Sequence, residues 1–225
     1  MKVQAIVVAA GSGERLKAGV AKPFVMLRGR PLIIHTLAVL QDCALIQSVI
    51  VAAHPDCLKK MTDVIHQAEL HKGSVVVAGG ATRSQSVKNS LAALDADTDV
   101  VLIHDGARPL ITADFVEQMI MAASFSDHAV IAAVPVKSTI KRANADSRLV
   151  EETLDRRVLW DVQTPQIFEK RMLLKAYSQD NIEATDDAAL VERMGGAVKI
   201  FPGLEQNIKI TTPYDLQIAE KILEG

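Results

Sequence analysis

The 225-residue sequence has few cysteines, little net charge and no long apolar run, and each shortage excludes a class of protein. Two cysteines, Cys43 and Cys57, are too few for a disulfide framework, and we expect reduced packing residues rather than metal ligands. The 25 basic and 27 acidic residues leave a net charge of −2, so no overall basic field points to nucleic acid. No leader-like segment opens the chain and no apolar run reaches about 18 residues. We therefore expect a soluble, cytoplasmic protein without a membrane partner.

Apolar and amphipathic stretches alternate along the whole chain. With 49% hydrophobic and 23% charged residues, the chain can bury one large core, so we expect a single domain over residues 1–225. The apolar runs show little polar alternation, which is typical of strands covered by helices on both faces. They predict an α/β fold with a doubly wound, mostly parallel sheet. The expected strands are residues 5–9, 48–53, 74–78, 100–104, 129–134 and 197–201, and the expected helices are 32–40, 56–69, 84–94, 112–123, 185–194 and 213–223.

Residues 136–154 break this alternation. The segments 136–142 and 149–154 alternate in polarity around a polar turn at 143–147, which predicts a β-hairpin. A two-stranded hairpin is not stable by itself and must pack against something. We expect this arm to pack against a second subunit.

The loop after the first expected strand has the composition of a phosphate-binding loop. Ala9-Ala10-Gly11-Ser12-Gly13 allows backbone N–H groups to turn toward an anion, and Arg15 and Lys22 add two positive charges. The loop is not a Walker motif, because Glu14-Arg15 stands where that motif needs Lys and then Ser or Thr. It is not a dinucleotide fingerprint either, because Leu16 replaces the third glycine. Taken alone, the loop fits a tight strand–helix turn equally well.

A second loop, Gly79-Gly80-Ala81, follows the third expected strand. Ligands of open α/β sheets bind beyond the carboxyl ends of the strands. Paired glycines allow the backbone to approach a flat ligand closely, and Ser86 follows at the start of the next expected helix. The alternative is an ordinary turn in which Thr82 or Ser84 caps that helix.

The fourth expected strand leads into His104-Asp105-Gly106-Ala107-Arg108. A carboxylate at a strand end suits Mg²⁺ carried by a triphosphate, since Mg²⁺ prefers carboxylate and phosphate oxygens. The alternative for Asp105 is a structural ion pair with Arg108. We interpret His104 as a packed histidine rather than a catalyst.

Together these motifs resemble one family. The ordered set is similar to the 2-C-methyl-D-erythritol 4-phosphate cytidylyltransferases of the non-mevalonate isoprenoid pathway, and the resemblance spans nearly the whole chain. Two departures, Leu16 for the usual Met and Pro23 for the usual Gln, remove no charge. The motifs are Ala9-Ala10-Gly11-x-Gly13-x-Arg15 with Lys22, Gly79-Gly80-x-x-Arg83-x-x-Ser86-Val87, His104-Asp105-Gly106-Ala107-Arg108-Pro109, Val134-Pro135-Val136, Leu154-Asp155-Arg156, Thr164-Pro165-Gln166 and Asn207-Ile208-Lys209.

The resemblance implies a Rossmann-like fold of the nucleotide-diphospho-sugar transferase type and a nucleotidyltransferase activity. The implied enzyme moves CMP from CTP to methylerythritol phosphate and releases pyrophosphate, with Mg²⁺ or another divalent cation. The second pKa of a phosphate monoester is about 6, so the acceptor is largely dianionic at neutral pH and attacks the α-phosphorus without a general base. Catalysis then depends on positioning and on neutralising charge at the α-phosphate.

The resemblance also implies the site residues. Arg15 and Lys22 are the expected catalytic cations, and Asp105 lies near or on the metal. The hairpin arm reaches across a homodimer, so that each site borrows residues from its neighbour. The implied nucleotide-binding residues are Ala9, Ala10, Gly11, Ser12, Gly13, Gly80, Ala81, Ser86, Asp105 and Gly106, and the implied acceptor-binding residues are Asp105, Arg108, Thr139, Arg156, Thr164, Thr185 and Lys209.

Several alternatives stay open. A ribitol 5-phosphate cytidylyltransferase shares the nucleotide loops, and a non-catalytic nucleotide-binding module shares the fold. Arg157 competes with its neighbour Arg156 as the phosphate contact, and Thr185 is also a good helix N-cap. Lys209, on an expected strand between two isoleucines, is harder to explain without a partner or a phosphate.

Overall fold

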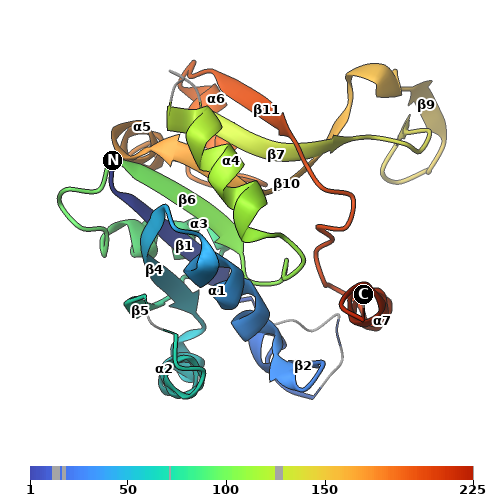
Figure 1. Cartoon of the computed structure of the whole chain (residues 1–225). Helices are drawn as coiled ribbons and strands as arrows, with labels where there is room; N and C mark the ends of the chain where they lie inside the picture. The colour runs from blue at the N-terminus through green and yellow to red at the C-terminus, as the bar shows by residue number, and fades with distance from the viewer. Residues whose placement is uncertain (12–15, 17–18, 71, 125–128, 225) are drawn as a thin grey trace.

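A mixed, mostly parallel sheet with helices on both faces forms the centre of the molecule (Figure 1). The computed structural model describes residues 1–11, 16, 19–70, 72–124 and 129–224. Over these residues the sheet has seven strands in the spatial order β11-β7-β10-β6-β1-β4-β5, and only β10 runs antiparallel to its neighbours. In chain order the strands are β1 Val3–Ala9, β4 Ile46–Ala53, β5 Ser74–Ala78, β6 Val100–Asp105, β7 Ala129–Pro135, β10 Trp160–Glu169 and β11 Val198–Pro202.

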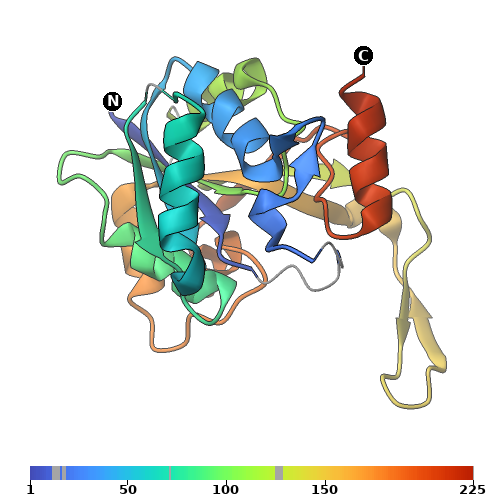
Figure 2. The same cartoon turned by 90° about the horizontal axis from the view of Figure 1, so that it is seen from below.

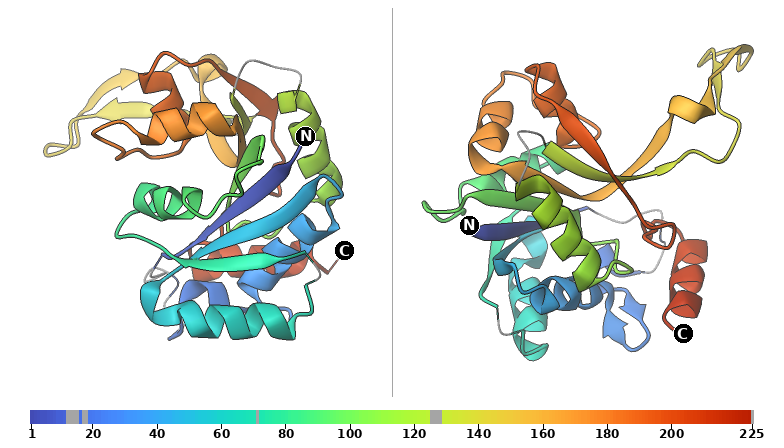
Figure 3. Two further views of the ribbon diagram at one scale, coloured as in Figure 1. Left: turned by 90° about the vertical axis from the view of Figure 1, so that its left-hand side faces the viewer. Right: turned by 45° about the horizontal axis from the view of Figure 1, so that its top comes forward.

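The helices cover both faces of this sheet (Figure 3). Alternate side chains of β1 point to opposite faces, as strand geometry requires. Ala5 and Val7 belong to a core cluster with α1, α2 and α4, whereas Ile6 belongs to a cluster with α3, α5 and α6. The helices are α1 Leu32–Asp42, α2 Leu58–Gln67, α3 Arg83–Leu91, α4 Ala113–Ser124, α5 Lys170–Tyr177, α6 Ala188–Arg193 and α7 Pro213–Ile222, with short 3₁₀ turns η2 Lys22–Phe24, η3 Pro55–Cys57 and η4 Arg156–Val158.

The doubly wound, mostly parallel α/β fold expected from the sequence is confirmed. Each of the six expected strands and six expected helices is present, with ends that differ by a few residues. The sequence analysis missed β10 and α5. The strand β10 contains Pro165, which normally argues against a central strand because proline cannot donate to the ladder. Its pairing with β7 is interrupted between Val162 and Gln166, so the proline lies where the ladder is irregular.

The parallel strands bring their carboxyl ends to one edge of the sheet. A small antiparallel ribbon, β2 Met26–Leu27 with β3 Arg30–Pro31, lies near this edge together with α7 (Figure 2). A third buried cluster lies there. It includes Leu27 of β2, Ala219 of α7 and Ile210 of the segment 203–212 that leads into α7. The C-terminal helix thereby anchors the segment 203–212, which leads from β11 to the edge of the sheet.

The expected hairpin is confirmed and projects away from the sheet (Figure 2). Its paired strands, β8 Lys141–Ala143 and β9 Val150–Thr153, are shorter than the segments expected from the sequence. Every residue of both strands is exposed. Backbone hydrogen bonds from Val136 to the Leu159 carbonyl and from Leu154 to the Ile140 carbonyl hold its base together. Its role in dimerisation stays a prediction.

The expectations for the two cysteines and for membrane-spanning segments can be compared with the structure. Cys43 and Cys57 are both free cysteines, as expected. Among the described residues, no helix combines the length and the apolar character needed to cross a bilayer. The cytoplasmic location and the lack of a nucleic-acid partner stay predictions.

Candidate active site

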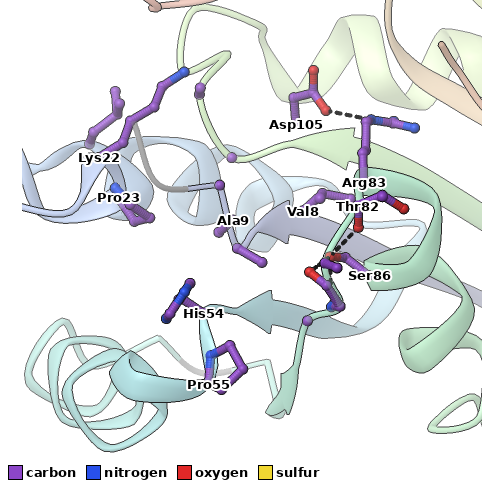
Figure 4. Close-up of a pocket in the computed structure, with 18 of the residues that line it drawn as sticks. Val8, Ala9, Lys22, Pro23, His54, Pro55, Thr82, Arg83, Ser86 and Asp105 are labelled. Carbon is purple, nitrogen blue, oxygen red and sulfur yellow. Dashed lines mark hydrogen bonds and ion pairs between the residues drawn. The ribbon is translucent and has the colours of Figure 1, made fainter. Parts of the chain in front are cut away.

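A pocket of about 580 Å³ opens where the carboxyl ends of β1, β4, β5 and β6 meet (Figure 4). This volume lies within the range typical of small-molecule sites. The pocket combines the first two glycine-containing loops and the end of β6, as the sequence predicted. It is lined by residues 8–11, Lys22, Pro23, Leu32, His54, Pro55, residues 79–83, Ser86, residues 105–107 and Lys209.

Two glycines allow the loop after β5 to approach its neighbours. A Cβ atom at Gly79 would overlap the Cβ of Ala10, so only glycine lets the β5 loop lie against the β1 loop. A Cβ atom at Gly80 would likewise overlap the side chain of Gln85. The paired glycines therefore shape the wall of the pocket.

Ser86 and Thr82 fix the backbone of this loop. The Ser86 hydroxyl, in the first turns of α3, accepts a hydrogen bond from the Gly80 N–H (3.0 Å) and donates one to the Thr82 carbonyl (2.9 Å). The Thr82 hydroxyl caps α3 by accepting from the Gln85 N–H (3.1 Å). The helix-cap alternative is thus confirmed for Thr82, and the capped loop also lines the pocket.

Asp105, at the end of β6, is surrounded by three cations. Arg83 Nε donates to Oδ1 (3.2 Å), Lys209 Nζ lies 2.6 Å from Oδ2, and Arg108 Nε lies 3.9 Å from Oδ2. The side chain is only 8% exposed, and burial alone would raise its pKa. The three positive charges outweigh burial and hold the pKa of Asp105 well below its usual range. The ion pair with Arg108, the alternative interpretation of Asp105, is present, but its N–O distance is the longest of the three.

His104 is a packed histidine, as expected. Its Nδ1 lies 3.0 Å from the hydroxyl of Thr164, and its Nε2 lies 3.0 Å from the carbonyl of Arg108. Because the Arg108 carbonyl can only accept, Nε2 carries the proton of the neutral ring, and Nδ1 accepts from the Thr164 hydroxyl. The same hydroxyl accepts from the Asp105 N–H (3.0 Å). Burial lowers the pKa of His104 to about 4.

Sequence comparisons agree with the motifs. A model of the 2-C-methyl-D-erythritol 4-phosphate cytidylyltransferase family matches residues 3–225. The enzyme of that name from Alkaliphilus metalliredigens is 45% identical to this chain over 226 residues, covering 99% of this chain and 93% of its own. The enzyme of that name from Syntrophus aciditrophicus is 41% identical, with coverages of 99% and 96%. This chain belongs to the 2-C-methyl-D-erythritol 4-phosphate cytidylyltransferase family.

Solved structures support the same assignment. The crystal structure of 4-diphosphocytidyl-2C-methyl-D-erythritol synthase from Anaerococcus prevotii matches with a TM-score of 0.86 at 30% identity, covering 100% of this chain and 99% of that one. The cytidylyltransferase from Thermus thermophilus matches with a TM-score of 0.79 at 33% identity, covering 100% of both chains. The chain is therefore a nucleotidyltransferase of isoprenoid biosynthesis, and the resemblance drawn from its motifs is confirmed.

Most of the implied nucleotide-binding residues of this cytidylyltransferase line the pocket. Ala9, Ala10 and Gly11 contribute the β1 side, Gly80, Ala81 and Ser86 the β5 side, and Asp105 and Gly106 the floor between them. Of the two expected catalytic cations, Lys22 lines the pocket. Ser12, Gly13 and Arg15 lie outside the described residues.

The implied acceptor-binding residues are more scattered, and of these seven only Asp105 and Lys209 line the pocket. The expectation that Lys209 lies on a strand is wrong. The residue lies in the segment between β11 and α7, which forms no strand. Arg108 is mostly buried and donates from Nη1 to the Asn207 carbonyl (2.6 Å). Thr164 is buried on β10, where its hydroxyl contacts His104 and the Asp105 backbone.

Thr139 and Arg156 are exposed and lie at the base of the hairpin arm. Arg157 is engaged with Asp155, because its Nη2 lies 2.8 Å from the carboxylate. Arg156 instead donates to the Lys137 carbonyl. The adjacent carboxylate therefore competes for Arg157, which favours Arg156 as the phosphate contact.

Thr185 is exposed in the segment between α5 and α6, and the helix-cap alternative for it is wrong. The helix α6 begins at Ala188 with Asp187 at the N-cap position. A carboxylate oxygen of Asp186, rather than the threonine hydroxyl, accepts from the backbone N–H of Ala189 (3.1 Å). The threonine hydroxyl is not needed for the helix start.

Arg83 was part of the second motif, but no site role was expected for it. It lines the pocket and donates a hydrogen bond to Asp105 (Figure 4). Its Nη2 lies 2.8 Å from the carboxylate of the buried Asp187. The available signal was an arginine one residue after a helix cap, next to a glycine pair. His54 and Pro55, at the end of β4, also line the pocket and were not expected.

The residues around Asp105 do not fit a resident metal ion. Both carboxylate oxygens already face cations, and a divalent ion there would be repelled by Arg83, Lys209 and Arg108. Within the described part of the chain, no three His, Cys, Asp or Glu side chains are grouped so that they could hold a metal. A direct metal bond to Asp105 is therefore disfavoured.

Proposed function

We propose that this chain transfers CMP from CTP to 2-C-methyl-D-erythritol 4-phosphate by direct in-line displacement in the pocket. An oxygen of the acceptor phosphate forms a bond to the α-phosphorus. The bond from that phosphorus to the oxygen bridging to the β-phosphate breaks, and pyrophosphate leaves with the electron pair. The products are 4-diphosphocytidyl-2-C-methyl-D-erythritol and pyrophosphate.

The observation that carries this proposal is the layout of the pocket. The glycine loop of β5 lies on one side of the pocket and Lys22 on the other (Figure 4). Lys209, from the segment between β11 and α7, also lines the pocket. A flat base fits against the closely approaching backbone at Gly80 and Ala81, and the triphosphate extends toward the β1 loop. Lys22, together with Arg15, then neutralises charge that builds at the α-phosphate.

The protonation states support a reaction without a general base. Asp105 is neutralised by its three cations and its pKa is held low, so it is a poor proton acceptor. His104 has both ring nitrogens in contact with neighbouring groups. A dianionic acceptor phosphate needs neither, because its attacking oxygen carries no proton. Asp105 instead orients Lys209 toward the acceptor, and Arg108 supports Asp105 from outside the pocket.

The divalent cation is best treated as part of the substrate. Mg²⁺ prefers phosphate oxygens and keeps several waters, so it enters bound to the triphosphate. The cations of the chain then act on the same phosphates from the protein side. The reaction then still requires a divalent cation, but the cation makes no direct bond to Asp105.

We further propose a homodimer with sites shared between subunits. Thr139 and Arg156 are exposed and lie outside the pocket of their own chain. The arm also exposes the apolar side chains of Leu149 (71%) and Val150 (60%), and η4 after it exposes Val158 (73%). A partner subunit that receives this arm would cover the apolar side chains and gain the acceptor-binding residues.

A pyrophosphate-release assay tests the activity. CTP, ATP, GTP and UTP are each combined with methylerythritol phosphate or ribitol 5-phosphate, with Mg²⁺ or with excess chelator. We expect turnover only with CTP, methylerythritol phosphate and the divalent cation. Comparable turnover with a purine nucleotide, or full activity in chelator, contradicts the proposal. A preference for ribitol 5-phosphate assigns the acceptor to the alternative enzyme.

A further inference from the structure

A buried polar relay connects the pocket to the segment between α5 and α6. Arg83 joins Asp105 of the pocket to Asp187, which is fully buried. The Tyr177 hydroxyl, at the end of α5, donates to Asp187 Oδ1 at 2.5 Å. A buried carboxylate needs such partners, since an unpaired charge in the interior is strongly destabilising. The relay thus runs from Asp105 through Arg83 and Asp187 to Tyr177.

Three consecutive residues at the start of α3, the N-cap Thr82 and the helical Arg83 and Ser84, contact this same segment. The Thr82 hydroxyl lies 3.1 Å from the Glu183 carboxylate, and the Ser84 hydroxyl lies 3.5 Å from the Ala184 carbonyl. The Arg83–Asp187 ion pair lies between them in the sequence. The residues that follow the glycine pair therefore fasten residues 183–187 at three points.

The central sheet holds the segment from the other side. Gln166 of β10 accepts through Oε1 from the N–H groups of Asp187 and Ala188, each at 3.2 Å. Its Nε2 donates to Asp186 at 2.8 Å. Thr185 is expected to bind the acceptor phosphate. The two residues on each side of it, 183–184 and 186–187, are held by hydrogen bonds or ion pairs.

We propose that Asp187 and Tyr177 are positioning residues of the transfer reaction. Neither lines the pocket, so both act through Arg83, which they hold against Asp105. Asp105 in turn orients Lys209, and the same relay fixes the segment that carries Thr185. The relay thereby sets the geometry of the acceptor relative to the nucleotide. This inference rests on the proposed function.

The phenol is the part of the relay that can be removed most cleanly. Burial raises the pKa of Tyr177, and the neighbouring Asp187 raises it further, so the hydroxyl stays a donor. Without that donor, one oxygen of Asp187 loses its partner and the carboxylate is free to rotate around the remaining ion pair. The guanidinium of Arg83 then shifts relative to Asp105.

Tyr177→Phe is therefore the primary test. The chain has only two tyrosines, and the other, Tyr214, is 70% exposed on α7, so Tyr214→Phe is a matched control. We expect Tyr177→Phe to lower kcat/KM for the acceptor about tenfold and to change KM for CTP less than about twofold, because one hydrogen bond to a charged group is lost. The control keeps wild-type constants.

Two more variants sharpen the test. Asp187→Asn is expected to cost more, and adding Tyr177→Phe to it should cost little further, because the two groups act as one unit. Glu183→Ala, on the surface, removes the contact with Thr82 without touching the core. A smaller fall in kcat/KM for the acceptor is expected there, and it can be measured if Asp187→Asn does not fold.

The outcomes separate the relay from the function. A lower Tm for Tyr177→Phe with kcat and both KM values unchanged overturns the proposal, as do fully additive losses in the double variant. A wild-type enzyme without turnover on these substrates refutes the proposed function instead. In that case amide hydrogen exchange over residues 183–188 still tests the relay. Faster exchange in Tyr177→Phe than in Tyr214→Phe supports it, and equal exchange overturns it.

Discussion

The nucleotide pocket and the hairpin arm are built in opposite ways. In the pocket, Asp105 is almost fully buried and makes ion pairs with residues from three separate segments. On the arm, Arg142 pairs with Glu151 and Glu152 in solvent, and every residue of β8 and β9 is exposed. Exposed ion pairs contribute little to stability. The pocket is therefore ordered by its own chain, whereas the arm needs a partner to bury its apolar side chains.

Under the proposed function, we expect this difference to divide substrate binding between two kinds of surface. The described residues that are expected to bind the nucleotide lie at strand ends and at the start of the capped helix α3. Two of the groups expected to bind the acceptor, Thr139 and Arg156, lie where their own pocket does not reach them. Variants in the pocket should act within one chain, and variants at the base of the arm should act on the neighbour.

The largest effect is expected from the pocket side. Lys22→Ala and Arg15→Ala should each lower kcat about 100- to 1,000-fold, far more than they raise KM for CTP, because their charges stabilise the transition state. Steady-state kinetics with CTP varied at saturating acceptor measures both constants. Lys59→Ala, an exposed lysine on α2, is the control. A near-normal kcat for Lys22→Ala would reduce that lysine to a structural role.

Subunit mixing tests the arm side of the comparison. The double variant Arg15→Ala, Lys22→Ala is mixed with Arg156→Ala under conditions of confirmed subunit exchange. If Arg156 acts on the neighbouring site, one site of each heterodimer carries every defect and the other carries none. We expect activity to reappear from two nearly inactive proteins. If activity does not recover after subunit exchange is proven, Arg156 acts on the site of its own chain, and the proposal of shared sites is wrong.

A smaller effect is expected from the close approach of the two pocket loops. Gly79→Ala places a methyl group against Ala10 and should destabilise the fold by about 1–3 kcal/mol, while raising KM for CTP. Gly73→Ala is the matched control, because a Cβ atom there meets no described atom within 4 Å. Urea unfolding and CTP-dependent kinetics measure the two effects. Equal stability of both variants would show that the loops can separate freely.

The strands that sequence patterns identified are those that obey simple rules. Runs such as 49–53 and 100–103 are apolar throughout because helices cover both of their faces. The strand β10 was missed because its first three residues are exposed, its buried part 163–168 includes two glutamines, and Pro165 interrupts it. Its place between β6 and β7 depends on pairing with strands far away in the sequence. The local pattern of apolar and polar residues does not indicate that pairing.

The site was predictable where glycines and strand ends mark it. The loops at 9–11 and 79–81 and the carboxylate at 105 meet in one pocket, as expected. The partners of Asp105 were not predictable, because Arg83 and Lys209 reach it from distant segments. Asp187 looked like part of a helix start, and its burial beside Arg83 follows only from tertiary packing.

The reversed direction of β10 has a consequence for how such enzymes can vary. Trp160, the first residue of β10, pairs with Pro135, the last residue of β7. The chain therefore leaves the sheet and returns to it at the same edge, and residues 136–159 form an excursion between two fixed points. Surface excursions tolerate changes in length and sequence better than the elements they connect. Natural variation can therefore alter the acceptor side of this enzyme and leave the strand order and the nucleotide side intact.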